Sequence, residues 1–109
     1  MEITEQASGG LTILRPVGRI DNDTSAEFQD KLLARLGGGS VLIDFTSVEF
    51  ISSAGLAALM TAAKQAKATS RRVGVAALGS VVQEIFTISR FSRVVPVFAS
   101  AAEGIAALQ

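Results

Sequence analysis

The feature that most constrains the fold is residues 40–67, where a strand pattern passes through a short loop into a helix pattern. Residues 41–45 form an apolar run of the length and type of a strand buried on both faces. Apolar side chains then recur at the spacing of one helical face, at Leu56, Leu59, Met60 and Ala63. A buried strand that leads directly into a helix predicts an α/β fold, with helices packed on a sheet.

Strand and helix patterns alternate along the rest of the chain. Residues 2–7 and 11–17 predict a hairpin around Ser8-Gly9-Gly10, with an antiparallel strand at the sheet edge. Strands joined through helices favour right-handed parallel crossovers, so the remaining strands should be parallel. The further predicted elements are a helix from Thr24 that Gly37-Gly38-Gly39 ends, a strand at 73–77, a helix at 80–89, a strand at 94–98 and a helix at 100–108. We therefore expect a mixed sheet of four to five strands packed with about four helices.

Local signals refine these boundaries. Capping-box spacing occurs at three helix starts, Thr24 with Glu27, Ser80 with Gln83 and Ser100 with Glu103. Residues 18–23 are rich in turn-forming residues and predict a turn. Because proline donates no backbone hydrogen bond, Pro16 and Pro96 should lie at a bulge, a strand end or a sheet edge.

Length and composition exclude several classes of function. The 109 residues predict one domain, 1–109, and the 10 basic and 10 acidic residues balance, which argues against a nucleic-acid surface. There is no His and no Cys, so neither a Ser-His pair nor a thiolate metal site can form. The start of the chain is polar, and no apolar run has the length of a membrane span. We expect a soluble cytoplasmic protein that is no enzyme, inserts into no membrane and holds no cofactor.

Ser52 and Ser53 lie where the loop after the strand enters the helix. Either hydroxyl could simply cap the helix, a contribution of about 1 kcal/mol. A phosphate on a serine at this position would also be well tolerated, because the first N–H groups of a helix lack partners and the helix dipole is positive there. The serine pair alone leaves both interpretations open.

Two groups of residues that contain carboxylates each have two possible roles. Asp21, Asn22 and Asp23 could contribute to a metal site, but they lack the spacing of a calcium loop and favour turn chemistry instead. Asp44, inside the apolar strand, should pair with a backbone or serine donor near the strand end, or else face solvent.

The pattern of the whole chain resembles the STAS domain, the family of bacterial anti-sigma-factor antagonists. In that family an apolar strand is followed by a Phe-aliphatic-Asp-Ser-Ser/Thr-Gly-Leu loop that opens a helix. The matching segments here are Leu42-Ile43-Asp44-Phe45, Phe50-Ile51-Ser52-Ser53-Ala54-Gly55-Leu56, the Gly18-Arg19-Ile20-Asp21 turn and the Val81–Phe91 helix. Ser52 and Ala54 depart from the family triplet, where Asp and Ser/Thr stand.

The resemblance implies that Ser53 is the serine phosphorylated by a kinase-type anti-sigma factor. Unmodified Ser53 would lie in a neutral surface that binds the anti-sigma factor and frees the sigma factor, and phosphorylation would release the partner. A serine phosphatase would reverse the change, the free chain would be a monomer, and Ser52 could be a second acceptor. The residues expected to bind the partner are Asp21, Asn22, Ser52, Ala54, Gly55 and Leu56. Because of the two departures, a STAS subunit of a larger assembly without phosphorylation, such as a transporter accessory protein or a stress-signalling scaffold, stays open as the alternative.

Overall fold

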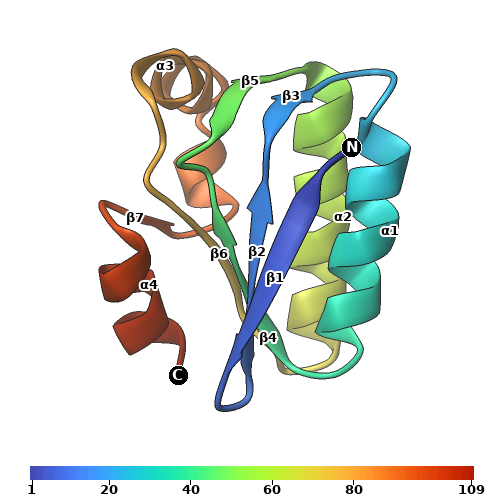
Figure 1. Cartoon of the computed structure of the whole chain (residues 1–109), viewed down its shortest axis with the longest axis vertical. Helices are drawn as coiled ribbons and strands as arrows, with labels where there is room; N and C mark the ends of the chain where they lie inside the picture. Colours follow the sequence, from blue (N-terminus) through green and yellow to red (C-terminus); the bar gives the residue numbers. More distant parts are fainter.

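The structure is a computed structural model that describes all 109 residues. A five-stranded sheet forms its centre, in the order β1-β2-β4-β6-β7, and a separate parallel pair joins β3 to β5 (Figure 1). The strands are β1 (Ile3–Ser8), β2 (Leu11–Pro16), β3 (Gly18–Ile20), β4 (Ser40–Asp44), β5 (Val48–Ile51), β6 (Val73–Ala76) and β7 (Val97–Phe98). The helices are α1 (Ser25–Leu36), α2 (Ser53–Ala68), α3 (Ser80–Ser89) and α4 (Ala101–Leu108), with a 3-10 turn at Phe91–Arg93. The α/β class, the mixed sheet and the four helices confirm the prediction.

Strand pairing follows the hydrophobic pattern closely. β1 pairs with β2 antiparallel at the edge, and β2, β4, β6 and β7 are all parallel. Pro16 ends β2, and Pro96 precedes β7, which is the other edge strand. Strand β7 contains only two residues, so the prediction of a strand over 94–98 was too long.

The pair β3–β5 was not predicted. Residues 18–20 were expected in a turn, and residues 50–51 in a loop, yet both form strands. Gly18 has φ +95°, a conformation that an L side chain rarely adopts, and there the chain bends from β2 into β3. The Gly18 N–H then donates to the Ser47 carbonyl (2.9 Å), which begins the pairing with β5. The strands are short and distant in sequence, so no local pattern marks them.

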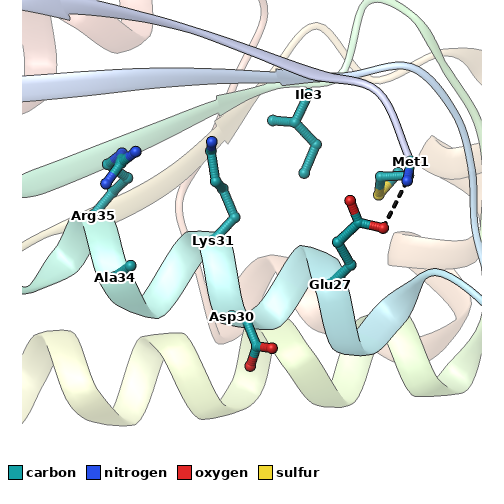
Figure 2. Close-up of a pocket in the computed structure, with 7 residues that line it drawn as sticks. All are labelled: Met1, Ile3, Glu27, Asp30, Lys31, Ala34 and Arg35. Atoms are coloured by element: carbon teal, nitrogen blue, oxygen red, sulfur yellow. Dashed lines mark hydrogen bonds and ion pairs between the residues drawn. The ribbon is translucent and has the colours of Figure 1, made fainter.

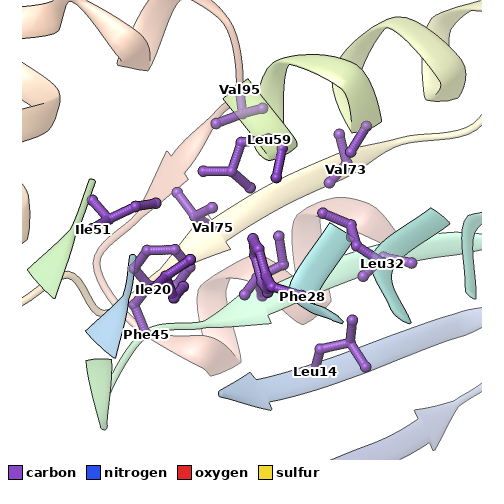
Figure 3. Packing of buried hydrophobic residues seen from close by; sticks show 14 of the residues in the cluster. Leu14, Ile20, Phe28, Leu32, Phe45, Ile51, Leu59, Val73, Val75 and Val95 are labelled. Carbon is purple, nitrogen blue, oxygen red and sulfur yellow. The ribbon is translucent and has the colours of Figure 1, made fainter. Parts of the chain in front are cut away.

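The core has two parts, one on each face of the sheet. The larger contains Phe28 and Leu32 of α1 together with Leu59 of α2, packed on Leu14 and Val75 of the sheet (Figure 3). A smaller cluster on the other face lies under α4 and includes Leu42 and Leu108. In Figure 1, α1 and α2 lie together on one side of the sheet and α4 lies on the other.

Helix α2 is rotated relative to its predicted orientation. Its fully buried side chains include Ala58, Leu59 and Ala62, whereas Leu56 and Met60 are only partly buried. The prediction favoured the larger side chains, but α2 packs closely beside α1, where alanines fit the contact better.

Two of the three predicted capping boxes are wrong. Thr24 directs its hydroxyl to the Arg19 carbonyl and to Asp21, so it makes no cap bond to α1. Ser80 is already the first residue of α3, and Gly79 takes the cap position. Ser100 does cap α4, because its hydroxyl accepts from the Glu103 N–H at 3.2 Å.

Candidate functional site

The end of β5 and the start of α2 hold the serine pair. Ser52 is the N-cap of α2, and its hydroxyl accepts a hydrogen bond from the Gly55 N–H at 3.3 Å. Its own N–H donates to the Ile20 carbonyl at 2.8 Å, which ties the helix start to the end of β3. Ser52 is therefore the capping serine, and its hydroxyl is already engaged.

Ser53 is the first residue of α2 and is exposed. Its hydroxyl makes no hydrogen bond within the chain, in contrast to that of Ser52. N–H groups in the first turn of a helix have no carbonyl partner within it, and the helix dipole is positive there. The Ser53 hydroxyl is thus accessible to a reagent or enzyme at a position that accepts negative charge.

Gly55 makes the close packing beneath Ser53 possible. A Cβ atom at this position would lie 2.6 Å from Ile51 Cγ1, 2.8 Å from Ile20 Cγ2 and 3.1 Å from the Ile20 carbonyl oxygen. Only glycine lets α2 approach the ends of β3 and β5 so closely. Gly55 itself is buried and packs beneath the surface, and a contact with a partner there stays a prediction.

The turn between β3 and α1 lies beside the serines. The Asp21 carboxylate accepts from the Asp23 N–H (3.0 Å) and from the Thr24 hydroxyl (3.2 Å), which is the turn chemistry that the sequence favoured. Asn22 is exposed at the tip. No group of three His, Cys, Asp or Glu side chains is arranged to hold a metal ion.

The segments expected to form a neutral surface around Ser53 carry a net negative charge. Residues 17–24 and 46–56 carry three carboxylates, on Asp21, Asp23 and Glu49, against one cation, Arg19, a net charge of −2. The Arg19 guanidinium lies 4.4 Å from the centre of the Phe50 ring and 3.8 Å from the Asp21 carboxylate. These elements were expected to be loops, so the sequence did not predict that Arg19 and Phe50 would face each other.

Asp44 belongs to the scaffold. It is buried at the end of β4, where Arg15 donates to it at 3.2 Å and the N–H and hydroxyl of Thr46 donate at 3.0 and 2.6 Å. A backbone donor near the strand end was one of the two predicted alternatives, and it is the one found. Arg15 on the neighbouring strand was not foreseen.

An open hollow of about 360 Å³ lies between β1 and α1 (Figure 2). Most of its charged groups have partners, because the Met1 amino group bonds to Glu27 at 2.6 Å and Lys31 and Arg35 both pair with Glu5. It contains none of the residues that were predicted to be phosphorylated or to bind a partner.

Comparison with known families and structures identifies the fold. The family model described as "Mlab, STAS domain" matches residues 3–96, most of the chain. The chain belongs to the STAS-domain family.

Named relatives share this domain over nearly their whole length. A Bordetella bronchiseptica protein that carries the name anti-sigma factor antagonist BtrV is 29% identical over 99 residues, which cover 89% of this chain and 85% of that protein. The crystal structure of an anti-sigma factor antagonist from Mycobacterium paratuberculosis superposes with a TM-score of 0.87 at 19% identity and covers 98% of this chain and 92% of the other. The anti-sigma factor antagonist SpoIIAA in its unphosphorylated form has a TM-score of 0.73 at 16% identity, covering 96% of this chain and 94% of its own.

The Bacillus SpoIIAA structure in the phosphorylated form has a TM-score of 0.75 at 14% identity, with 99% of this chain and all of the other covered. At this level of identity the solved structures establish the fold of the STAS domain alone.

None of the four helices of the domain has the length and apolarity that crossing a bilayer requires.

Proposed function

We propose that this STAS domain is an anti-sigma-factor antagonist controlled by phosphorylation of Ser53. In the unphosphorylated form it binds a serine-kinase anti-sigma factor and thereby frees the sigma factor. The observation that carries the proposal is an exposed hydroxyl without a partner on the first residue of α2, beside a second serine that already serves as the cap. The names of BtrV and of the SpoIIAA structures support the general role.

The surface that binds the partner would consist of the exposed atoms around Ser53. Among the residues expected to bind the partner, Asn22 is exposed. The others that reach the surface are partly exposed, namely Asp21, Ser52, Ala54 and Leu56. Phosphorylation would add a charge of about −1.5 to −2 to segments whose net charge is already negative. A charge buried in an interface without a partner costs about 2–5 kcal/mol, enough to release a bound protein. A serine phosphatase would restore the binding form.

The fold need not change for this switch to operate. The phosphate would lie at the N-terminus of α2, where the first N–H groups are available, and Ser52 would keep its cap bond to Gly55. Release of the partner would then come from charge at the surface rather than from unfolding of the domain.

The test is phosphorylation in vitro by a kinase-type anti-sigma factor from the same organism, with ATP, read by intact mass. We expect a gain of one phosphate in the unmodified protein and in Ser52→Ala, and none in Ser53→Ala. In a pull-down with the kinase, Ser53→Ala should bind constitutively and Ser53→Asp should bind poorly. Equal binding by both Ser53 variants and the wild type would refute the switch.

A second candidate function follows from Ser52 and Ala54, which stand where the family triplet has Asp and Ser/Thr. A STAS subunit of a transporter or a signalling scaffold would use the same surface without phosphorylation. No gain in mass with any such kinase, together with co-purification of transporter subunits, would favour that function over the first.

A further inference from the structure

We propose that a hollow at the C-terminal end of α2 binds a small organic anion with an apolar chain, either a carboxylate or a phosphate monoester. The hollow has a volume of about 310 Å³ and lies between α2, the start of β6, the segment before β7 and the end of α4. This volume is at the lower end of the range for small-molecule pockets, which favours a small ligand. The hollow is about 20 Å from Ser53 along the axis of α2, and the inference is therefore independent of the proposed phosphorylation.

The inside of the hollow is apolar. Ala66 of α2, Val73 of β6 and Leu108 of α4 line it with exposures of only 2%, 6% and 5%. Val94 and Pro96, in the segment that precedes β7, extend this lining. Because these residues come from four parts of the chain, the folded domain itself forms the hollow. An apolar chain bound here would be removed from water, which is favourable.

The charged side chains that line the hollow are all cationic. They are Lys67, Arg71 and Arg72, and no Asp or Glu lies among the lining residues. None of the three forms an ion pair within the chain. Residues 64–73 carry four basic residues and no acidic one, although the whole chain has no net charge. The C-terminus of α2 offsets only a fraction of this positive charge, so a bound anion would be stabilised.

The two arginines are held in position and still have donors for a ligand. Arg71 donates to the Leu36 carbonyl at the end of α1, and Arg72 donates to the Ala107 carbonyl of α4 at 2.9 Å. Each of these bonds satisfies a carbonyl near the C-terminus of a helix. A guanidinium has five N–H donors, so one such bond leaves others for a carboxylate or a phosphate.

Charge and apolar lining together specify the class of ligand. An inorganic anion would pair with the cations but leave the apolar side chains in contact with water. A neutral apolar molecule would cover those side chains but leave the cations without a partner. A molecule with an anionic head and a short apolar chain satisfies both parts of the hollow.

The test is a titration of the whole chain, labelled with nitrogen-15, with octanoate and with octyl phosphate, followed by NMR of the backbone amides. Both probes should produce saturable shifts at Lys67, Arg72 and Leu108, with little change at Ser53. Octanol, which lacks the charge, and inorganic phosphate, which lacks the chain, should each bind at least about tenfold more weakly. The tighter of the two anionic probes identifies the preferred head group.

Two lysine variants separate a specific contact from the general charge of the helix. Lys67→Glu should weaken octanoate binding by about fivefold or more, because this lysine lines the hollow. Lys64→Glu makes the same change in charge one turn earlier on α2, at an exposed residue outside the lining, and should stay within about twofold of the wild type. Circular dichroism establishes that both variants keep the fold.

Three results would overturn the proposal. The first is the absence of saturable shifts at the lining residues with both anionic probes. The second is binding of octanol or inorganic phosphate as tightly as octanoate, which would remove the need for a head group or for a chain. The third is an equal loss of affinity in the two lysine variants, which would show only an effect of general charge.

Discussion

Replacement of Gly55 by alanine tests how closely the start of α2 must approach the two short strands. The added Cβ would lie 2.6 Å from Ile51 Cγ1 and 2.8 Å from Ile20 Cγ2, whereas carbon atoms in favourable contact are about 3.5–4.0 Å apart. Ile20 and Ile51 are 0% and 1% exposed, so neither has free space to move into. A third contact, at 3.1 Å, is with the backbone oxygen of Ile20, which is fixed by the Ser52 N–H.

The expected cost follows from two opposing contributions. Overpacking of a tightly packed site costs about 1–3 kcal/mol, and alanine gains up to about 1 kcal/mol over glycine inside a helix. The gain is smaller in the first turn, so Gly55→Ala should lower the free energy of unfolding by about 1–2 kcal/mol. For a domain of this size the melting temperature should fall by about 5–10 °C.

Urea denaturation followed by circular dichroism measures this change, and the midpoint should fall without a change in slope. Gly10→Ala is a matched control, because a Cβ there meets nothing within 4 Å and its φ lies outside the left-handed region. We expect the control to stay within about 0.5 kcal/mol of the wild type. A Gly55→Ala protein as stable as the control would refute the argument that α2 needs glycine at this contact.

Two further substitutions test other contacts. Ser52→Ala removes the hydroxyl that accepts the Gly55 N–H, so the free energy of unfolding in urea should fall by about 1 kcal/mol, and an unchanged midpoint would contradict the assigned cap. A hydrogen bond from Arg35, and to a smaller extent one from Lys31, holds the pKa of Glu5 below its usual value of 4.5. The ionised Glu5 carboxylate therefore stabilises the fold above pH 4.5, and this stabilisation is lost as the pH falls through the lowered pKa. Glu5→Gln should therefore have a lower free energy of unfolding than the wild type at neutral pH, and the difference between the two proteins should shrink below pH 4.5. A difference in unfolding free energy that persisted unchanged in strong acid would contradict the pairing of Glu5 with Arg35 and Lys31.

Long and locally patterned elements could be predicted from the sequence. The buried strand at 41–45, the edge hairpin around Gly9 and the end of α1 at Gly37 all carry signals within a few residues of the feature itself. The resemblance to STAS domains rested on several such segments together, and the family match over residues 3–96 confirms it.

Features that depend on distant contacts were missed. Strands β3 and β5 contain three and four residues, and each is defined by pairing with a segment about 30 residues away. The stacking of Arg19 on Phe50 exists only because of that pairing, so it could not be inferred before the strands were known. Thr24 has the spacing of a cap, but in the folded chain its hydroxyl has nearer partners at the Arg19 carbonyl and Asp21.

The pair β3–β5 stands apart from the five-stranded sheet, and this separation has a consequence for how such a domain can diversify. Ile20 and Ile51 anchor the pair from within, while Arg19 and Glu49 project from it into solvent. In the proposed function, substitutions at the projecting positions would alter which protein is recognised without reaching any residue of the main sheet. Specificity for a partner and stability of the fold would thereby depend on different side chains of the same two short strands.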